Sequence, residues 1–267
     1  MMDDTHENLT DKKVWGNYYK WKNTLNVVNK FINRYFFDAE IIDVKSRFLK
    51  SDSPKNLMEM GVGGSVWFPF FVKKFGHRAY GIDYLQIGCD FAIEKLKKEK
   101  IRNFEIYYGD FFEYYKILQD KMDFVVSFGV VEHFNPPTKA IKVFANYLND
   151  DGIMINTCPN TGGFAMHLQK YFDKKVYDNH LRFTLKDFIR YHEECGFDVI
   201  HASYTGFLSF NNLVFSNYSL AGRVSKIFIK LINAPIVCVF YWVKRVLNIN
   251  FSSKFFSSIM IVVSKKR

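Results

Sequence analysis

The stretch Asn56 to Asp83, NLMEMGVGGSVWFPFFVKKFGHRAYGID, decides the fold. The run 56–60 predicts a strand, the glycines after it predict a tight turn, and a helix is expected from about Ser65. The run 78–82 predicts a second strand, which closes on Asp83. Glycines at a strand-to-helix turn let a ligand approach the backbone, because no Cβ stands in the way. Since the helix start offers unpaired N–H groups and an acid there can accept from ribose hydroxyls, the stretch predicts a nucleoside-binding unit.

An acid at the end of the first strand, Glu59, narrows the choice of ligand. Its carboxylate would repel a pyrophosphate, and it suits a ligand that carries an amino group and a sulfonium cation. The run Glu59 to Ser65, EMGVGGS, resembles the E/D-x-G-x-G-x-G signature of class I S-adenosylmethionine-dependent methyltransferases. Ser65 stands where that signature has its third glycine, with Gly64 beside it. An ordinary tight turn between a strand and a helix is the alternative interpretation.

The resemblance implies a set of cofactor-binding residues. It places the methionine end of S-adenosylmethionine near Glu59 and the ribose at Asp83. Asp110 would accept from the adenine amino group while Phe111 stacks on the base. Asp110 is alternatively a helix N-cap, and the two roles are compatible. The expected cofactor-binding residues are Glu59, Gly61, Gly63, Gly64, Asp83, Tyr84, Asp110, Phe111 and Phe128.

Five more strand-like runs follow along the chain. The run Met122 to Phe128, MDFVVSF, is almost wholly apolar, which is typical of a central strand buried on both faces. Thr184, with Asp187 three positions later, predicts a capped helix that Gly196 ends. Strands alternate with helices, so we expect an α/β fold: a doubly wound, mostly parallel, seven-stranded sheet of the Rossmann-like methyltransferase kind. The remaining strands are expected at 104–108, 152–157, 197–204 and 258–264.

Three parts of the chain follow from this order. Residues 1–50 are expected to form an N-terminal arm and lid helices, including an amphipathic helix over 14–37 that covers the cofactor, walls the acceptor site or packs on the sheet. Residues 51–210 and 256–267 are expected to form the methyltransferase core. Residues 211–255 form an apolar helical insertion, for which a lid, a dimer contact and a membrane-surface contact are alternatives.

The segment after the fourth strand carries the candidate catalytic residues. The sequence VVEHF, which contains His133, resembles the "-LEH-" element of the small-molecule methyltransferases known from ubiquinone and menaquinone biosynthesis. Methyl transfer needs a base only where the acceptor must lose a proton, as a hydroxyl does. Histidine as a residue type changes its charge near neutral pH, so His133 is the first candidate base, with a role in holding the loop as the alternative. His180 is the second candidate.

The expected activity is methyl transfer from S-adenosylmethionine to a small-molecule or glycan acceptor, at oxygen. The histidines favour oxygen, and so does Ser127-Phe128-Gly129-Val130, which stands where N-methylating nucleic-acid and protein-glutamine enzymes carry Asn/Asp-Pro-Pro-Tyr. Methylation of carbon or nitrogen on a quinone-type or lipid acceptor is an alternative. So are a nicotinamide-dependent oxidoreductase on a related sheet and a non-catalytic binding scaffold.

Composition limits the partners. The net charge is +10 over 267 residues, but the lysines are scattered and form no dense basic run, so no nucleic-acid partner is expected. No Cys or His cluster has metal-ligand spacing, so no metal is expected. The polar N-terminus is not a secretory signal, and we expect a cytoplasmic protein. A peripheral contact of residues 223–245 with the inner face of the membrane, or a homodimer, is left open.

Overall fold

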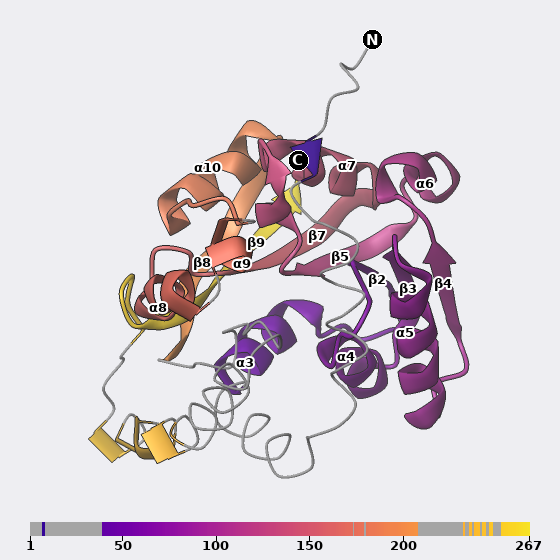
Figure 1. Ribbon diagram of the computed structural model, residues 1–267. Helices are drawn as coiled ribbons and strands as arrows, with labels where there is room; N and C mark the ends of the chain where they lie inside the picture. The colour runs from indigo at the N-terminus through magenta and orange to yellow at the C-terminus, as the bar shows by residue number, and fades with distance from the viewer. Residues whose placement is uncertain are drawn as a thin grey trace.

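A seven-stranded sheet crosses the middle of the molecule (Figure 1). The computed structural model describes residues 7–8, 39–172, 174–178, 180–207 and 252–267, and the helical residues 232, 235–236, 238–240, 242–243 and 246–247. In the order in which they pair, the strands are β4 (Phe104–Tyr108), β3 (Arg78–Asp83), β2 (Asn56–Met60), β5 (Met122–Phe128), β7 (Leu148–Pro159), β9 (Ser257–Lys266) and β8 (Phe197–Phe207).

The pairing confirms the predicted fold class. The strands from β4 to β7 in this order all run parallel, whereas β9 is antiparallel to both of its neighbours, β7 and β8. The last strand in the sequence therefore lies inside the sheet, between β7 and β8. A small second sheet pairs β1 (Glu7–Asn8) with β6 (Phe134–Asn135), so the beginning of the chain lies beside the segment that follows β5.

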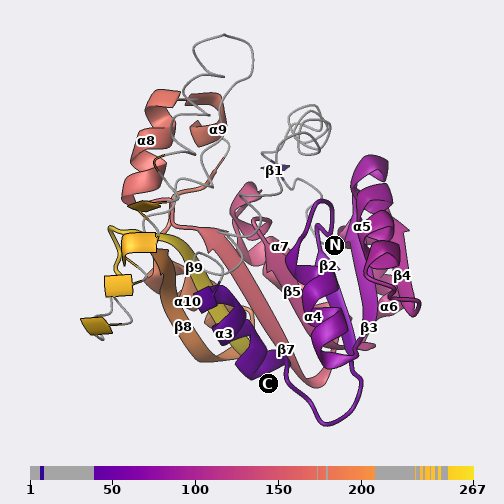
Figure 2. The same ribbon diagram turned by 90° about the horizontal axis from the view of Figure 1, so that it is seen from below.

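Helices cover both faces of the sheet (Figures 1 and 2). One face is covered by α3 (Ala39–Leu49), α4 (Trp67–Phe75) and α5 (Gln86–Lys98), and the other by α6 (Phe111–Leu118), α7 (Thr138–Tyr147) and α10 (Leu185–Glu194). Two further helices, α8 (Phe164–Phe172) and α9 (Lys174–Asp178), lie between β7 and α10 in the sequence.

Alternating side chains of β5 build the two apolar layers. Val125 is fully buried and packs in the same cluster as Phe144 of α7, while Val126 packs in the opposite cluster with Phe68 of α4. Successive side chains of a strand point to opposite faces, so a strand covered on both sides must be apolar at nearly every position. This explains why the run MDFVVSF was a reliable signal of a central strand.

Several elements differ from the sequence prediction. The helix expected from Ser65 begins at Trp67, because Ser65 still belongs to the turn and its N–H donates to the carbonyl of Val62. The strand expected at 152–157 extends over 148–159, because the predicted turn before Gly152 is a register shift inside β7. Helix α9 was not predicted.

The predicted helix cap before α10 is confirmed. The Thr184 hydroxyl accepts from the N–H of Asp187, and the Asp187 carboxylate accepts from the Thr184 N–H at 2.9 Å. These two bonds satisfy backbone donors that a helix start would otherwise leave unpaired. Gly196, which follows the helix, has φ of +84°, a conformation that favours glycine.

His192 on α10 is a structural residue. It is fully buried, its Nδ1 lies 2.7 Å from the Ser264 hydroxyl of β9, and its Nε2 lies 3.2 Å from the Asn156 side-chain nitrogen of β7. Burial lowers the pKa of His192 to about 3, so the ring is neutral and joins the helix to two strands.

The insertion before β9 is described in part. Its described residues between 232 and 247 are helical, and no helix within the described residues is long and apolar enough to cross a bilayer. The helix expected over 14–37 lies outside the described residues.

Candidate active site

The carboxyl ends of four parallel strands meet along one edge of the sheet. The pairing places Met60 of β2 beside Ile82 of β3 on one side and Ser127 of β5 on the other. The glycine-rich turn, the acids after β3 and β4 and the segment after β5 therefore lie at this same edge. Ligands of open α/β sheets bind outside the carboxyl ends of the strands, where the strand order reverses.

The glycine-rich turn fits tightly against its neighbours. The N–H groups of Gly61 and Val62 donate to the carbonyl of Ile82, at 2.9 and 3.1 Å. Gly61 has φ of +69°, and a Cβ built on it would lie 2.8 Å from Cγ2 of Val130. A larger residue would be strained there and would push Val130 away, so this position requires glycine.

Asp83, the last residue of β3, holds the glycine-rich turn through a hydrogen bond. Its side chain is 4% exposed; one carboxylate oxygen accepts from the N–H of Gly63 at 2.8 Å, and the other accepts from the N–H of Leu85 at 2.8 Å. Burial raises the pKa of Asp83, and these two hydrogen bonds oppose that shift. Holding the turn is a role that the sequence did not suggest, while binding of the ribose stays a prediction. Tyr84, the next residue, is half-buried.

Glu59 is buried below the turn. One of its oxygens accepts from the Ser65 hydroxyl at 3.0 Å, and the other, Oε2, has no hydrogen-bond partner in the part of the chain that the structure describes. The same Ser65 hydroxyl accepts from the N–H of Phe68 at the start of α4, at 3.2 Å. The serine in place of the third glycine thus orients Glu59 and caps the helix. Burial raises the pKa of Glu59.

Lys45 of α3 lies near two expected site residues, Glu59 and Phe128, and the sequence analysis did not single it out. It is 1% exposed, its charge acts on the carboxylate of Glu59, and its Nζ lies 5.6 Å from the centre of the Phe128 ring. Burial lowers the pKa of Lys45, and the nearby carboxylate opposes the shift. A signal was present, because Lys45 falls on the apolar stripe of its helix between Ile41 and Leu49, where a solvated lysine would not be expected.

Asp110 is the N-cap of α6, as one interpretation of the sequence held. Its carboxylate accepts from the N–H of Phe112 at 2.9 Å. The ring of Phe111 packs edge-on against Phe134 and Phe144, with centroid distances of 5.5 and 5.1 Å. The contacts of Asp110 and Phe111 with adenine stay predictions.

The structure brings the two predicted histidines together and adds Glu132. The 3₁₀ helix Val131–His133 follows β5, and the His133 and His180 rings lie 4.7 Å apart between centroids. Nε2 of His133 lies 3.9 Å from Oε1 of Glu132, which is fully buried. The N–H of Leu181 donates to the Glu132 carbonyl at 3.0 Å and so holds the two segments side by side. Burial raises the pKa of Glu132 to about 7.

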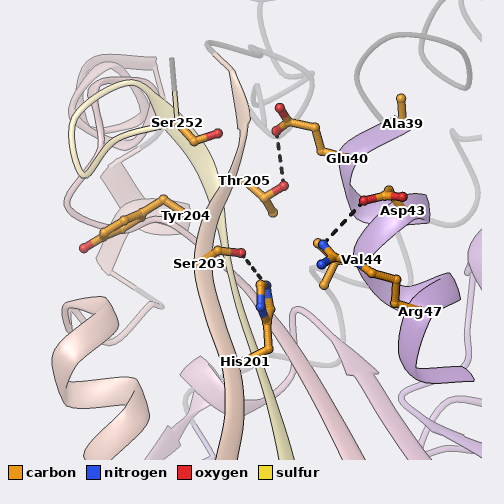
Figure 3. Close-up of a pocket in the computed structure, with 10 residues that line it drawn as sticks. All are labelled: Ala39, Glu40, Asp43, Val44, Arg47, His201, Ser203, Tyr204, Thr205 and Ser252. Atoms are coloured by element: carbon orange, nitrogen blue, oxygen red, sulfur yellow. Dashed lines mark hydrogen bonds and ion pairs between the residues drawn. The ribbon is translucent and has the colours of Figure 1, made fainter. Parts of the chain in front are cut away.

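A separate open cavity of about 390 Å³ lies between α3 and the end of β8 (Figure 3). Glu40 and Thr205 approach each other across it at 3.3 Å, and Asp43 and Arg47 form an ion pair along the helix. It contains none of the expected site residues, and no residue of the glycine-rich turn lines it. We therefore place the candidate active site at the strand ends, not in this cavity.

Comparison with known proteins identifies the family and the fold. A family model described as Methyltransferase domain matches residues 32–202. Among the solved structures that share the fold is a SAM-dependent methyltransferase from Thermotoga maritima, at 13% identity and a TM-score of 0.55, over 96% of this chain and 97% of that one. A SAM-dependent methyltransferase from Archaeoglobus fulgidus has 19% identity and a TM-score of 0.53, over 90% of this chain and 100% of that one. Phosphoethanolamine N-methyltransferase 2 from Haemonchus contortus, in complex with S-adenosylhomocysteine, has 18% identity and a TM-score of 0.56, over 85% of this chain and 52% of that one. Comparison with curated protein sequences finds no match.

The fold and the family match define a class I methyltransferase. The chain belongs to the methyltransferase domain family, and it is an S-adenosylmethionine-dependent methyltransferase. This decides against the nicotinamide-dependent oxidoreductase and the non-catalytic scaffold. The residues at the strand ends fit the cofactor in their chemistry, because the buried Oε2 of Glu59 has no hydrogen-bond partner among the described residues and could accept from an ammonium group.

Proposed function

We propose that the enzyme transfers the methyl group to an oxygen atom of a small-molecule or glycan acceptor. The observation that carries the proposal is the cluster of Glu132, His133 and His180. Glu132 and His133 lie in the 3₁₀ helix just after β5, and His180, between α9 and α10, joins them. A hydroxyl must lose its proton during methyl transfer, and this cluster is built from groups that can promote that loss.

The chain supplies alignment, charge and proton removal. When bound, S-adenosylmethionine supplies an electrophilic methyl group on a sulfonium. Asp83 would hold the ribose, and Glu59 and Lys45 together present an anion and a cation to the amino and carboxylate groups of the methionine end. Phe128 lies beside Lys45 and would wall the methyl-bearing end. Alignment of this kind is the main protein contribution to an in-line displacement.

The cluster would contact the acceptor on the side that faces away from the cofactor. His133 is 5% exposed and His180 is half-buried. Water therefore has limited access to the pair, and an acceptor would approach it from the side of His180. The acceptor hydroxyl would lie against the histidines as its proton leaves. Methylation of nitrogen or carbon on a quinone-type or lipid acceptor is the alternative. A neutral amine can attack the methyl group without first losing a proton, so it would not require this cluster.

The proposal is tested with S-adenosylmethionine labelled in its methyl group. The full chain is incubated with pools of saccharides and phenols, of amines, and of quinols and lipids, and the products are separated. We expect label in methyl ethers from the hydroxyl pool, with one S-adenosylhomocysteine formed per methyl group. Calorimetry with S-adenosylhomocysteine confirms that the preparation binds cofactor. Label found solely on nitrogen or carbon would overturn the oxygen assignment.

We further propose a peripheral contact with an anionic membrane surface through the segment 223–245. Supporting this, the apolar side chains of Ile232, Val239 and Trp242 are 37%, 57% and 64% exposed, and basic residues flank the segment in the sequence. Apolar side chains next to lysine and arginine bind the interface of anionic bilayers.

Flotation tests this contact. The full chain is expected to float with vesicles of anionic lipid and to remain in the dense fraction with zwitterionic vesicles. The variant Trp242→Ser should float less, because it removes the most exposed of these three side chains. Retention of the full chain in the dense fraction with both vesicle types would contradict the proposal, and a dimer seen by light scattering would favour a second copy instead.

A further inference from the structure

We propose that Glu132, His133 and His180 bind one divalent transition-metal cation, and that this cation takes the acceptor oxygen as a further ligand. The inference rests on the proposed function, since it assigns a role to the same cluster. It departs from the sequence-based expectation of no metal. No ligand spacing was visible along the chain, because His180 is far in sequence from the Glu132-His133 pair and meets it only in the fold.

The three side chains are already gathered. One ligand atom from each lies within 4.8 Å of the others, and Nε2 of His133 lies 3.9 Å from Oε1 of Glu132. Ligand atoms about 2 Å from a common cation are roughly 3 to 4 Å apart, so small rotations of the rings would complete the site. The backbone bond from Leu181 to Glu132 fixes the two segments that carry the ligands.

Burial makes the cluster unusual as a purely structural arrangement. Glu132 is 0% exposed, and its Oε1 has no hydrogen-bond partner among the described residues. A buried carboxylate oxygen without a partner is costly, and a bound cation would remove that cost. The other oxygen, Oε2, accepts from the Cys158 thiol at 3.2 Å, which orients the carboxylate in the way that outer contacts orient metal ligands.

The donor set indicates the class of metal. Two imidazoles and one carboxylate suit Zn²⁺, Mn²⁺, Fe²⁺ or Co²⁺ rather than Ca²⁺ or Mg²⁺, which prefer oxygen ligands. Three protein ligands leave at least one coordination position open. Because His180 is half-buried, that position can face the acceptor.

A cation there changes how the acceptor loses its proton. A hydroxyl bound to a divalent metal has a lowered pKa and ionises near neutral pH without a general base in contact with it. The oxygen would then attack the methyl carbon as the carbon–sulfur bond breaks, and the proton would pass to water. In this arrangement His133 and His180 are metal ligands, and the cation promotes the proton loss that the proposed function requires.

The test is direct binding of Co²⁺ and Zn²⁺ to the chelator-treated full chain. We expect one Co²⁺ per chain, with visible absorption bands of a site that contains nitrogen ligands, and displacement of Co²⁺ by Zn²⁺. His180→Ala should weaken Co²⁺ binding at least about tenfold, because loss of even an outer contact of a metal site costs that much. His201→Ala, which removes a partly buried histidine of β8 outside the cluster, is the matched control and should bind as the wild type does.

Two results would overturn the proposal. One is no stoichiometric binding by a wild-type chain that still binds S-adenosylhomocysteine. The other is unchanged Co²⁺ affinity and spectrum in His180→Ala. Cofactor binding is measured on every sample, so failure of the metal site is distinguished from failure of the methyltransferase: a chain that binds metal but methylates no hydroxyl would retain the site and refute the oxygen acceptor.

Discussion

Replacing His133 with alanine is expected to lower turnover by about 10²- to 10⁴-fold, the usual contribution of a group that promotes proton transfer. Affinity for S-adenosylhomocysteine should stay nearly unchanged. The reason is positional: His133 lies in the 3₁₀ helix after β5 and faces His180, whereas most of the expected cofactor contacts lie on the turn after β2 and at the ends of β3 and β4. The loss is expected whether the imidazole accepts the proton itself or binds a cation that promotes its release.

Single-turnover rates and calorimetry on the same preparation measure the two quantities. His201→Ala serves as the control, since it removes an imidazole from β8 without touching the cluster. If His133→Ala lost cofactor affinity and turnover in equal proportion, the residue would be holding the loop, which is the structural alternative that its burial allows.

Asp83→Ala is expected to weaken binding of S-adenosylhomocysteine by about 1 to 3 kcal/mol, or roughly 5- to 150-fold, the cost of losing a charge-assisted hydrogen bond. Two effects act together. The variant would lose the acceptor for the ribose hydroxyls, and it would release the N–H of Gly63 that fixes the turn. Asp83→Asn, which keeps the shape of the side chain, should recover part of the affinity. Calorimetry measures all three proteins.

The variant Lys45→Met tests the methionine end of the cofactor, whereas Asp83→Ala tests the ribose. Asp83→Ala should weaken binding of both S-adenosylhomocysteine and methylthioadenosine, since both contain the ribose. Lys45→Met should weaken binding of S-adenosylhomocysteine alone, because methylthioadenosine lacks the amino and carboxylate groups. Equal affinity of wild type and Asp83→Ala for both ligands would contradict a role of Asp83 in cofactor binding.

The sequence predicted the parts of the fold that depend on local patterns. The strand Met122 to Phe128 was recognisable because burial on both faces requires apolar residues throughout. The cap at Thr184 was recognisable because its two hydrogen bonds join residues three apart. Both signals lie within a few residues, and the structure confirms both.

The site was predictable only in part, because its remaining contacts join distant segments. The charge of Lys45 acts on Glu59 from a helix that precedes the first strand of the core, and Glu132 meets His180 although three helices and β7 lie between them in the sequence. No pattern within a short window records such meetings. The hydrogen bond from the Ser65 hydroxyl to Glu59 was not predictable either, because it depends on the conformation of the turn between them.

The place of β9 has a consequence for how the protein is made. This strand is synthesised after every other described strand, yet its residues from Ile259 to Val263 are fully buried and β8 is joined to the sheet only through it. While the ribosome is still producing the insertion, β7 and β8 therefore present open edges that could pair with other nascent chains. Closure of this half of the molecule has to wait for β9, and slow translation of the insertion would lengthen the period in which chaperones are needed.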